Sequence, residues 1–518
     1  MDLPVSLARA RTDALTRFVV HGPDPQVQQP VAAFTGEPTA PVPVSSAADV
    51  GIAFDVARRA QRSWARRGFD ERVRVLRRVQ RLALQRREAL IDVVQWESGK
   101  ARLHAFEEVV DIVNNAGYYA RTAARALRPN PARGWIPGVS SVQVSRPPKG
   151  VVGLITPWNY PLCLPVSDAL PALAAGNAVV LKPDLQTPFS ALAGAELLHD
   201  AGLPEGLLQV VVGEGEVIGP LVVERADAVA FTGSTEIGRL IAEQTGRRLI
   251  GSSLELGGKN AQLVLADADV QRAVRGTLRS TFASAGQLCV SMERIYVHDS
   301  VYDTFVPALV QAVREMRVGA SFDYTTDMGS LASAAQLQRV RRHVDEAVDK
   351  GATVLVGGLA RPDLGPFFFE PTLLTDVDES MTLCREETFG PVASIYRVST
   401  VDEAVARCND SDYGLTACIW TRDTTKGRLI ARQLRAGTVS INEGYGAWWG
   451  SVDAPMGGMR ASGLGARHGR EGIVRFTDTQ SVAVQRLVGL GVLPGMSQRQ
   501  YVGTMSRLVA ALSRIARP

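Results

Sequence analysis

One cysteine, Cys289, stands in a segment of small and amide side chains, "SAGQLCV" at residues 284–290. A thiol becomes a strong nucleophile once it is ionised, and at neutral pH it needs a nearby base or a lowered pKa to ionise. The small neighbours would let a substrate approach closely, but the segment holds no histidine that could act as the base. A cysteine is more often a small buried packing residue than a nucleophile, so the rest of the sequence must decide.

The segment "LELGGKN", residues 254–260, offers a base thirty-four residues before Cys289. Glu255 stands between two leucines, and two glycines follow. Such a setting removes water from the carboxylate and raises its pKa. A carboxylate with a raised pKa is suited to general-base catalysis near neutral pH, so Glu255 is interpreted as the base that Cys289 requires.

Polar residues follow two short apolar runs that are typical of buried strands, "VVGLIT" at 151–156 and "NAVVLKP" at 177–183. After the first run, in "TPWNYP", Asn159 could donate its amide N–H to a developing oxyanion. At the end of the second run, Lys182 could bind a ribose or a phosphate. A lone asparagine or lysine usually forms a turn or lies at the surface. Their occurrence at corresponding strand ends favours a ligand site instead.

The segment "FTGSTEIG", residues 231–238, closes another apolar run and opens a stretch that can form a helix. Gly233, Ser234 and Gly238 therefore stand where backbone N–H groups and a helix N-terminus can bind a phosphate. The segment is not the phosphate loop of ATP-binding proteins, because Arg239 and Leu240 replace its lysine and its serine or threonine. On its own the segment is equally consistent with a tight turn between a strand and a helix.

These residues must be positioned by a sheet. Apolar runs separated by helix-forming stretches, between residues 151 and 234, predict a parallel sheet covered on both faces, as in a doubly wound α/β domain. A second α/β series begins near residue 262 with "QLVLADADV". Residues 46–128 are predicted to be helical. Around residues 130–150, proline and glycine bracket the alternating "SVQVS", which favours an extended arm or hairpin.

Composition excludes several classes of protein. The chain has 518 residues, enough for about two to four domains, and its 46% hydrophobic and 21% charged residues are typical of a globular protein. The net charge of +4 is scattered, so nucleic acid is not an expected partner. Five widely spaced cysteines without a C-x-x-C pair predict neither disulfides nor a metal site. No apolar run suggests a signal peptide or a membrane span, so we expect a cytoplasmic protein without a membrane partner.

Seven motifs together resemble the aldehyde dehydrogenase superfamily, from about residue 46 to residue 480. They are "TPWNYP", "LKPD", "FTGSTEIG", "LELGGKN", "GQLC", "EETFGP" and "PMGG", in the family's order and approximate spacing. Within the superfamily the sequence is nearest to the actinobacterial succinate-semialdehyde dehydrogenases. The resemblance implies an α/β fold with a Rossmann-type cofactor domain, an α/β catalytic domain and a β-arm for oligomerisation. It also implies the NAD(P)-dependent oxidation of an aldehyde to a carboxylic acid.

The resemblance also divides the chain. It assigns residues 1–133 and 148–255 to the NAD(P)-binding domain, and residues 256–460 to the catalytic domain, with 461–478 packing back on the cofactor domain. It assigns residues 134–147 and 479–496 to the oligomerisation arm of a homodimer or homotetramer. Residues 497–518 form a C-terminal tail beyond the usual pattern, and the sequence does not indicate its role.

Carried over by motif, Cys289 would attack the aldehyde to form a thiohemiacetal, which is then oxidised to a thioester. The side-chain amide of Asn159 and the backbone N–H of Cys289 would form the oxyanion hole, and Glu255 would activate the water that hydrolyses the thioester. The residues expected to contact the cofactor are Thr156, Pro157, Trp158, Lys182, Leu185, Gly213, Gly233, Ser234, Gly238, Leu256, Gly257, Glu387 and Phe389.

Leu185 bears on the choice of cofactor. Members of the family that prefer NAD commonly carry a glutamate three residues after the lysine of the "LKP" motif, where it binds the ribose 2′-OH and repels a 2′-phosphate. Leu185 takes that place here. Since the repulsion is absent and Lys182 is near, NADP is expected to be preferred over NAD.

The motifs favour succinic semialdehyde as the substrate and succinate as the product. Related enzymes often hold the substrate carboxylate with two arginines, but here those places are Ala283 and Ser167 with Asp168. A carboxylate that enters a pocket without a cation loses hydration that it cannot replace. Arg460 is a remote candidate for the missing cation.

Two alternative functions stay open. Trp448 and Trp449, in the long segment 442–455, could line an apolar substrate mouth, with Ser451 as a further substrate contact. Apolar or aromatic aldehydes are therefore the main alternative. A cofactor-independent thioesterase that uses Cys289 is a less favoured one, because such an enzyme has no use for the phosphate-type motif.

Overall fold

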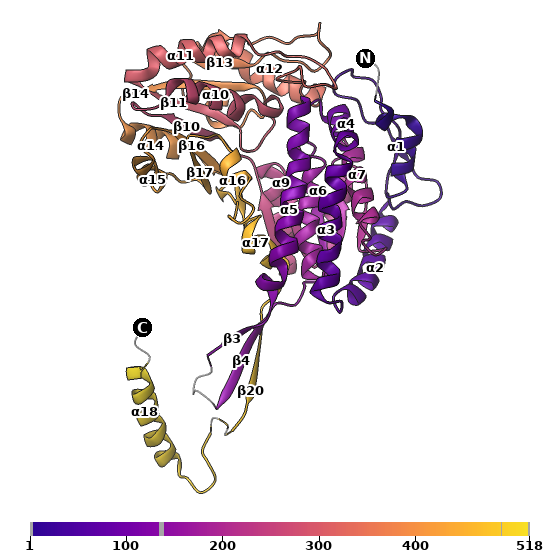
Figure 1. Cartoon of the computed structure of the whole chain (residues 1–518), viewed down its shortest axis with the longest axis vertical. Coiled ribbons are helices and arrows are strands. Elements are labelled where there is room, and N and C mark those ends of the chain that lie inside the picture. The colour runs from indigo at the N-terminus through magenta and orange to yellow at the C-terminus, as the bar shows by residue number, and fades with distance from the viewer. Residues whose placement is uncertain (1–3, 134–138, 488, 490, 516–518) are drawn as a thin grey trace. The chain divides into compact units, whose positions relative to one another are not determined.

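The computed structural model describes residues 4–133, 139–487, 489 and 491–515. These residues divide into two compact units, each described by itself below. The first unit comprises residues 1–126 and 148–478, and the second comprises residues 127–147 and 479–518. Figure 1 shows the elements of both units.

The first sheet of the first unit has six strands in the order β19-β9-β8-β5-β6-β7. Their bounds are β5 (Val151–Ile155), β6 (Ala178–Lys182), β7 (Leu208–Val210), β8 (Ala228–Thr232), β9 (Gly251–Glu255) and β19 (Gly463–Leu464). All pairings are parallel except that of β19 with β9. Lys182 and Glu255 are the last residues of β6 and β9, so their side chains lie at the carboxyl edge where doubly wound sheets bind ligands.

Helices connect and cover these strands. They are α2 (Ala47–Trp64), α3 (Phe69–Gln85), α4 (Arg87–Ser98), α5 (Arg102–Leu127), α6 (Cys163–Ala175), α7 (Pro188–Asp200), α8 (Gly215–Arg225) and α9 (Thr235–Arg248). The helical prediction for residues 46–128 is confirmed by α2 to α5. In α3, for example, Leu76 and Val79 are fully buried while arginines occupy the opposite face, as the 3.6-residue period requires.

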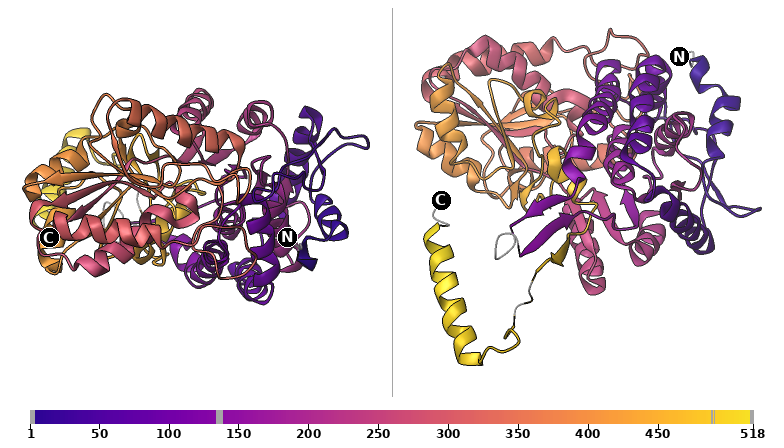
Figure 2. Two further views of the ribbon diagram at one scale, coloured as in Figure 1. Left: turned by 90° about the horizontal axis from the view of Figure 1, so that it is seen from above. Right: turned by 60° about the horizontal axis from the view of Figure 1, so that its bottom comes forward.

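The second sheet of the first unit has seven strands in the order β12-β13-β14-β11-β10-β16-β17. Their bounds are β10 (Asn260–Val264), β11 (Met292–His298), β12 (Thr353–Val356), β13 (Thr372–Thr375), β14 (Val392–Val398), β16 (Thr416–Trp420) and β17 (Thr438–Ile441). Only the pairing of β12 with β13 is antiparallel. Helices lie on both faces of this sheet in Figure 2, namely α10 (Val270–Phe282), α11 (Asp299–Arg314), α12 (Ala334–Asp349), α14 (Val401–Asn409) and α15 (Thr424–Ala431).

A short connection joins the two sheets. Glu255 ends β9 and Asn260 begins β10, so the four residues "LGGK" carry the chain from the first sheet to the second. The remaining short elements of the first unit are η1 (Val5–Leu7), α1 (Arg9–Thr16), β1 (Val27–Gln28), β2 (Val42–Pro43), η2 (Ala283–Gly286), α13 (Thr382–Arg385), β15 (Tyr413–Gly414), α16 (Gly446–Trp449), β18 (Met459–Arg460) and α17 (Gly469–Val474).

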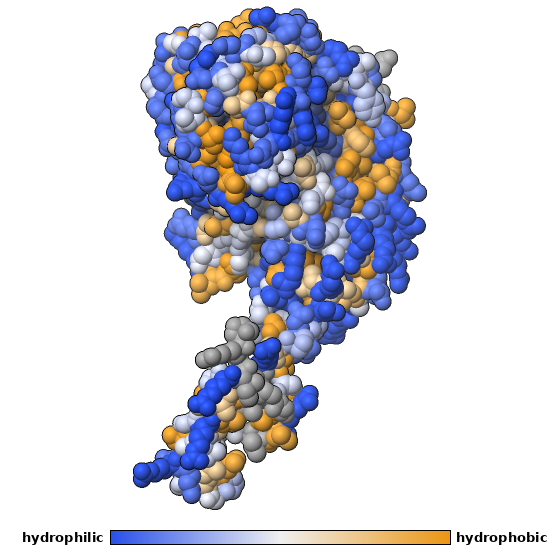
Figure 3. Space-filling view, turned by 60° about the vertical axis from the view of Figure 1, so that its left-hand side comes forward, coloured by the Kyte–Doolittle hydropathy of each residue, from blue (hydrophilic) through white to orange (hydrophobic). Residues whose placement is uncertain are grey.

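The second unit contains a three-stranded antiparallel sheet in the order β20-β4-β3 and one helix. The elements are β3 (Asn130–Ala132), β4 (Ser140–Ser145), β20 (Gln480–Gln485) and α18 (Gln498–Ile515). Strand β3 lies in the range expected for the cofactor domain, but it pairs with β4 and belongs to the second unit, which begins at residue 127. Residues 134–138 of the expected arm and 516–518 of the tail lie outside the described residues. Hydrophobic and hydrophilic residues are mixed on the face of this unit seen in Figure 3, and Val482 and Val484 of β20 are half exposed.

Among the described residues, no helix is long and apolar enough to cross a membrane. The cytoplasmic location expected from the sequence stays a prediction.

The core of the second sheet gives a test of the fold. Leu263 of β10 is completely buried, and Leu84 of α3 is 45% exposed. We expect Leu263→Ala to lower the free energy of unfolding by about 2–5 kcal/mol, because it leaves a cavity in a close-packed core. The matched change Leu84→Ala should cost less than about 0.5 kcal/mol. Urea unfolding followed by tryptophan fluorescence compares the two, and equal midpoints would contradict this assignment of the core.

Candidate active site

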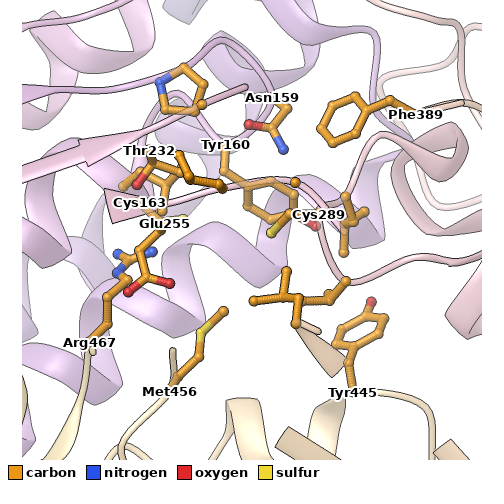
Figure 4. Close-up of a pocket in the computed structure, with 18 of the residues that line it drawn as sticks. Asn159, Tyr160, Cys163, Thr232, Glu255, Cys289, Phe389, Tyr445, Met456 and Arg467 are labelled. Carbon is orange, nitrogen blue, oxygen red and sulfur yellow. The ribbon is translucent and has the colours of Figure 1, made fainter. Parts of the chain in front are cut away.

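A cavity of about 280 Å³ lies at the carboxyl ends of β5, β8 and β9, against the loop that precedes β11. Cys289, Glu255 and Asn159 all line it (Figure 4). They come from three separate parts of the chain: the segment after β5, the end of β9, and the loop between α10 and β11. The fold therefore brings together the nucleophile, base and amide that the sequence analysis singled out.

The loop that carries Cys289 has an uncommon backbone. Ser284 and Ala285 have φ angles of 51° and 55°, in the left-handed region that residues other than glycine rarely adopt. At Gly286, with φ 70°, a side chain would clash with the backbone of Gly390. This conformation is held because the Ser284 N–H donates to His104 Nδ1 over 3.2 Å.

Two amide side chains fix the loop from outside. Asn159 Nδ2 donates to the carbonyl oxygen of Gln287 over 2.9 Å, which holds the Asn159 amide next to the loop. Asn260 Nδ2 donates to the carbonyl oxygens of Cys289 and Ser291 over 2.7 and 2.9 Å. The motif "LELGGKN" alone does not predict this role of Asn260, whose two buried hydrogen bonds orient the Cys289 backbone.

Burial governs the acid–base properties of the site. It raises the pKa of the Cys289 thiol to about 12, and the neighbouring Glu387 and Glu255 act in the same direction. Burial also raises the pKa of Glu255 to about 8, against the opposing effect of Arg467 and Arg475. Both carboxylate oxygens of Glu255 are buried without a hydrogen bond among the described residues. The thiol is therefore protonated at neutral pH, and Glu255 has free lone pairs to accept a proton.

Glu387 and Phe389 approach the cavity from the second sheet. Glu387 Oε1 accepts from the backbone N–H of Gly258 over 2.9 Å. Phe389, with φ 57°, contacts the Trp158 ring edge-on at 5.5 Å between centroids. Its backbone N–H donates to buried Glu293 over 2.9 Å, and Lys259 pairs with the same carboxylate. Lys259 and Glu293, which the sequence analysis did not identify, thus anchor the "TFG" turn at the cavity.

The expected cofactor residues fall into two groups. Those that line the cavity are Pro157, Trp158, Gly233, Ser234, Leu256, Gly257, Glu387 and Phe389. Those that do not line it are Thr156, Lys182, Leu185, Gly213 and Gly238. Of the second group, Lys182 ends β6, and a side-chain carbon on Gly215 would lie 3.9 Å from its Nζ. Lys182 therefore lies at the neighbouring strand ends, beside the turn that opens α8.

These groups fit a dinucleotide. Ser234 caps α9 by accepting from the Ile237 N–H, so the positive end of this helix points to the carboxyl edge of the sheet. Thr156 Oγ1 is buried there without a hydrogen bond among the described residues. Lys182 is buried at the same edge, and burial lowers its pKa. A phosphate and ribose hydroxyls would give all three groups a partner.

The residues expected to contact the substrate do not all lie in the cavity wall. Trp448 and Trp449 line the cavity, whereas Ser451 and Arg460 do not. Ser451 follows α16 and faces a different hollow, beside Arg428 and Arg432. Arg460 is exposed on β18, and its guanidinium donates to the carbonyl oxygens of Asn409 and Ser411, so it is directed away from the cavity.

Two arginines reach the cavity, Arg339 and Arg467, and neither was identified from the sequence. Arg339 donates to the carbonyl oxygen of Glu387. Arg467 Nε donates to Asp168 Oδ1 over 3.0 Å, and Arg475 donates to the same oxygen over 2.7 Å. Although burial opposes the effect, the two arginines hold the pKa of Asp168 below its usual range. The other polar residues of the cavity that the sequence analysis did not identify include Glu107, Asp111, Tyr160, Tyr445 and His468.

The family model "Aldehyde dehydrogenase family" matches residues 21–482. The chain belongs to the aldehyde dehydrogenase family. The resemblance given by the seven motifs is confirmed, and this aldehyde dehydrogenase is an NAD(P)-dependent oxidoreductase with the expected α/β fold.

Individual relatives and a solved structure support the same family. A protein of Mycolicibacterium smegmatis named "Putative succinate-semialdehyde dehydrogenase [NADP(+)]" is 50% identical over 93% of each chain. The mitochondrial succinate-semialdehyde dehydrogenase of Arabidopsis thaliana is 37% identical over 87% of this chain and 84% of its own. The crystal structure of betaine aldehyde dehydrogenase from Staphylococcus aureus in complex with NAD+ superposes with a TM-score of 0.87, at 30% identity, over 94% of this chain and 99% of that chain.

The raised thiol pKa makes a direct prediction. In the free aldehyde dehydrogenase, the rate of Cys289 alkylation by iodoacetamide should keep rising up to about pH 10, because the buried thiol is still mostly protonated there. A small thiol in the same buffers should level off above about pH 9. Mass spectrometry of the Cys289 peptide separates its reaction from that of the other four cysteines. A plateau below about pH 9 would show that the free enzyme already holds the thiolate.

Proposed function

We propose that this aldehyde dehydrogenase oxidises succinic semialdehyde to succinate with NADP, using Cys289 as the nucleophile. The observation that carries the proposal is that Cys289, Asn159 and Glu255 line one cavity, which Glu387, Phe389 and Ser234 also line. A nucleophile, an oxyanion donor and a base thus share one space with the residues expected to bind the cofactor.

The chain's own residues account for the proton and bond changes. Glu255 takes the Cys289 proton as sulfur bonds to the aldehyde carbon, and the Asn159 amide stabilises the oxyanion of the adduct. The bound cofactor supplies the hydride acceptor that converts this adduct to a thioester. Glu255 releases this first proton to solvent and then takes a proton from a water molecule, whose oxygen attacks the thioester carbon. As the C–S bond breaks, this second proton passes from Glu255 to the departing sulfur. The products are the carboxylic acid and the regenerated thiol.

NADP is supported by two observations. The relative of 50% identity carries NADP(+) in its name, and Leu185 stands where an acidic residue would repel a 2′-phosphate. Leu185 is half-buried, two residues after the Lys182–Pro183 pair at the end of β6. Lys182 and the N-terminus of α9 would hold the cofactor, with Glu387 on a ribose hydroxyl.

The substrate assignment has a competing candidate. Succinic semialdehyde is supported by the names of the relatives from Mycolicibacterium smegmatis and Arabidopsis thaliana. Apolar or aromatic aldehydes are favoured by the cavity wall, which includes Tyr445, Trp448, Trp449 and Met456. Both candidates use the same reacting groups and differ only in what the distal part of the substrate contacts.

We also propose that the three-stranded sheet of the second unit is the oligomerisation arm of a homodimer or homotetramer. Strand β20 lies at the edge of this sheet, and an edge strand with unpaired backbone groups can pair with another chain. Half-exposed Val482 and Val484 on β20 would be covered in such an assembly. The first sheet with its helices would bind the cofactor, and the second would carry catalysis.

Steady-state kcat/KM for a panel of aldehydes separates the candidate functions. We expect the highest kcat/KM for succinic semialdehyde with NADP. The absorbance of the reduced nicotinamide measures the rate for each aldehyde. A higher value for benzaldehyde or hexanal than for succinic semialdehyde would favour the apolar alternative. Thioester hydrolysis without any cofactor-dependent oxidation would indicate the thioesterase instead.

Replacement of the base should separate the two halves of the reaction. In Glu255→Gln we expect a burst of about one reduced cofactor per active site that forms more slowly than in wild type, because hydroxide must then take the thiol proton. Turnover after the burst should be slowed about 10²–10⁴-fold, because no group activates the hydrolytic water. In Cys289→Ala neither burst nor turnover should occur. Rapid-mixing absorbance measures both phases, and normal steady-state turnover of Glu255→Gln would remove Glu255 as the base.

The cofactor preference can be tested at Leu185. We expect Leu185→Glu to lower kcat/KM for NADP about tenfold or more, because the new carboxylate would repel the 2′-phosphate, while NAD should be affected little. Leu185→Gln is the matched control, since it has a similar size without the charge. Equal losses in the two variants would show that the position does not contact the 2′-phosphate.

A further inference from the structure

We propose that Arg467 is a positioning residue for the reaction: it serves as the counter-charge that favours the ionised, basic form of Glu255, and Asp168 fixes it in place. The inference rests on the proposed function, because it concerns the base of that same site. Nothing in the motifs quoted for the family resemblance assigns Arg467 or Asp168 this role.

The geometry places the two opposite charges in one cavity without a direct bond. Arg467 and Glu255 both line the cavity, and their exposed fractions are 8% and 5%. Figure 4 shows the guanidinium and the carboxylate on the same side of the cavity. Within the described part of the chain, no salt bridge or hydrogen bond joins them, and both Glu255 oxygens lack a partner. The arginine can thus stabilise the charge of Glu255 while the lone pairs stay free for water.

Hydrogen bonds to neighbouring residues hold Arg467 in place. Its Nε donates to Asp168 Oδ1, and Arg475 shares the same oxygen. Arg475 also donates to Ser253 Oγ over 2.8 Å, and Ser253 precedes Glu255 on β9 by two residues. Two guanidinium groups therefore share the one carboxylate of Asp168. The cluster fixes the cation of Arg467 next to the strand that carries the base.

Other titratable groups lie near this cluster. Burial lowers the pKa of His468 to about 3, so it is neutral. Burial raises the pKa of Asp111 to about 6, so it is mostly ionised at neutral pH and offsets part of the charge of Arg467. Its carboxylate accepts from Ser167 Oγ over 2.5 Å. Cys289, with a pKa raised to about 12, is neutral at neutral pH. Of the groups that act on Glu255, Arg467 and Arg475 favour its ionised form, and burial and Asp168 oppose it.

A role as the anchor of a substrate carboxylate fits the same residue less well. Arg467 already interacts with three carboxylates, those of Asp168, Asp111 and Glu255. A substrate carboxylate would add a further acidic group to a buried cation that has only one positive charge to offer. The surroundings therefore favour the role toward Glu255, and the experiment includes the anchor as an outcome.

The direction of the pH effect follows from the sign of the charge. Burial raises the pKa of Glu255 to about 8, and Arg467 limits the rise. Removal of the positive charge would raise this pKa further, so that a smaller fraction of Glu255 is ionised at neutral pH. Thioester hydrolysis would then need a higher pH, while it would still reach a similar rate once Glu255 is ionised.

The test compares Arg467→Met with the charge-conserving Arg467→Lys in the full-length enzyme with NADP. The rate of turnover after the burst is measured from about pH 6 to pH 10, and the burst amplitude counts the correctly folded sites. In wild type and in Arg467→Lys, the rate should rise with increasing pH, and the midpoint of this rise should give an apparent pKa near 8. In Arg467→Met, the apparent pKa should move up by about one unit or more, and the rate at pH 7 should fall about tenfold with the burst retained.

Three results would overturn the inference. An unshifted pKa in Arg467→Met with a full burst would show that Arg467 does not act on the base. A shift of equal size in Arg467→Lys would show that shape rather than charge is responsible. A rise in KM for succinic semialdehyde alone, with no effect on the uncharged butanal, would identify a substrate anchor. If the wild type reduces no cofactor with any aldehyde, the proposed function fails, which is a different result from an unshifted pKa. If Arg467→Met does not fold, Arg467→Gln provides the uncharged variant.

Discussion

The active site depends above all on the removal of water from its ionisable groups. Desolvation is the largest influence on the thiol of Cys289 and on the carboxyl groups of Glu255 and Glu387, and it raises the pKa of each. The thiol rests protonated and the base binds protons near neutral pH, so the nucleophile forms only when a base takes its proton. The same burial strengthens every hydrogen bond and charge in the cavity, because little water competes with them.

Burial of this kind requires a rigid frame, and the frame is built where the two sheets meet. The connection from Glu255 to Asn260 carries the base at one end and the amide that orients Cys289 at the other. Buried Glu293, paired with Lys259, holds the backbone of Phe389. A shift of one sheet against the other would therefore move base, nucleophile and Phe389 together, which explains why the reacting groups stand on strand ends and tight loops rather than on long mobile segments.

The sequence predicted the parts of the site that lie in local patterns. Cys289, Glu255 and Asn159 stand in short motifs at strand ends, and parallel strands place such ends at a common edge. The sequence could not predict the contacts that depend on pairing between distant segments. Arg467 reaches the cavity because β19 pairs with β9, and Asp168 meets it from α6, about three hundred residues earlier. Arg460 was chosen on sequence grounds, but its backbone has φ 55° and its guanidinium binds carbonyl oxygens outside the cavity. The membership of β3 in the second unit depends on a pairing as well, since β3 is defined by its hydrogen bonds to β4.

The acids of the cavity differ in how their charge is balanced, and this difference singles out the base. Glu107 accepts hydrogen bonds from Arg279 and Tyr445, Asp111 from Ser167, and Glu387 from Gly258. Glu255 is the one acid, among those described in the cavity wall, whose two oxygens are buried without any hydrogen bond. An acid with bonded oxygens has its lone pairs occupied and binds a new proton less readily. A positive group near Glu255 but not bonded to it, as Arg467 is, favours the carboxylate while leaving its oxygens free to accept a proton from water.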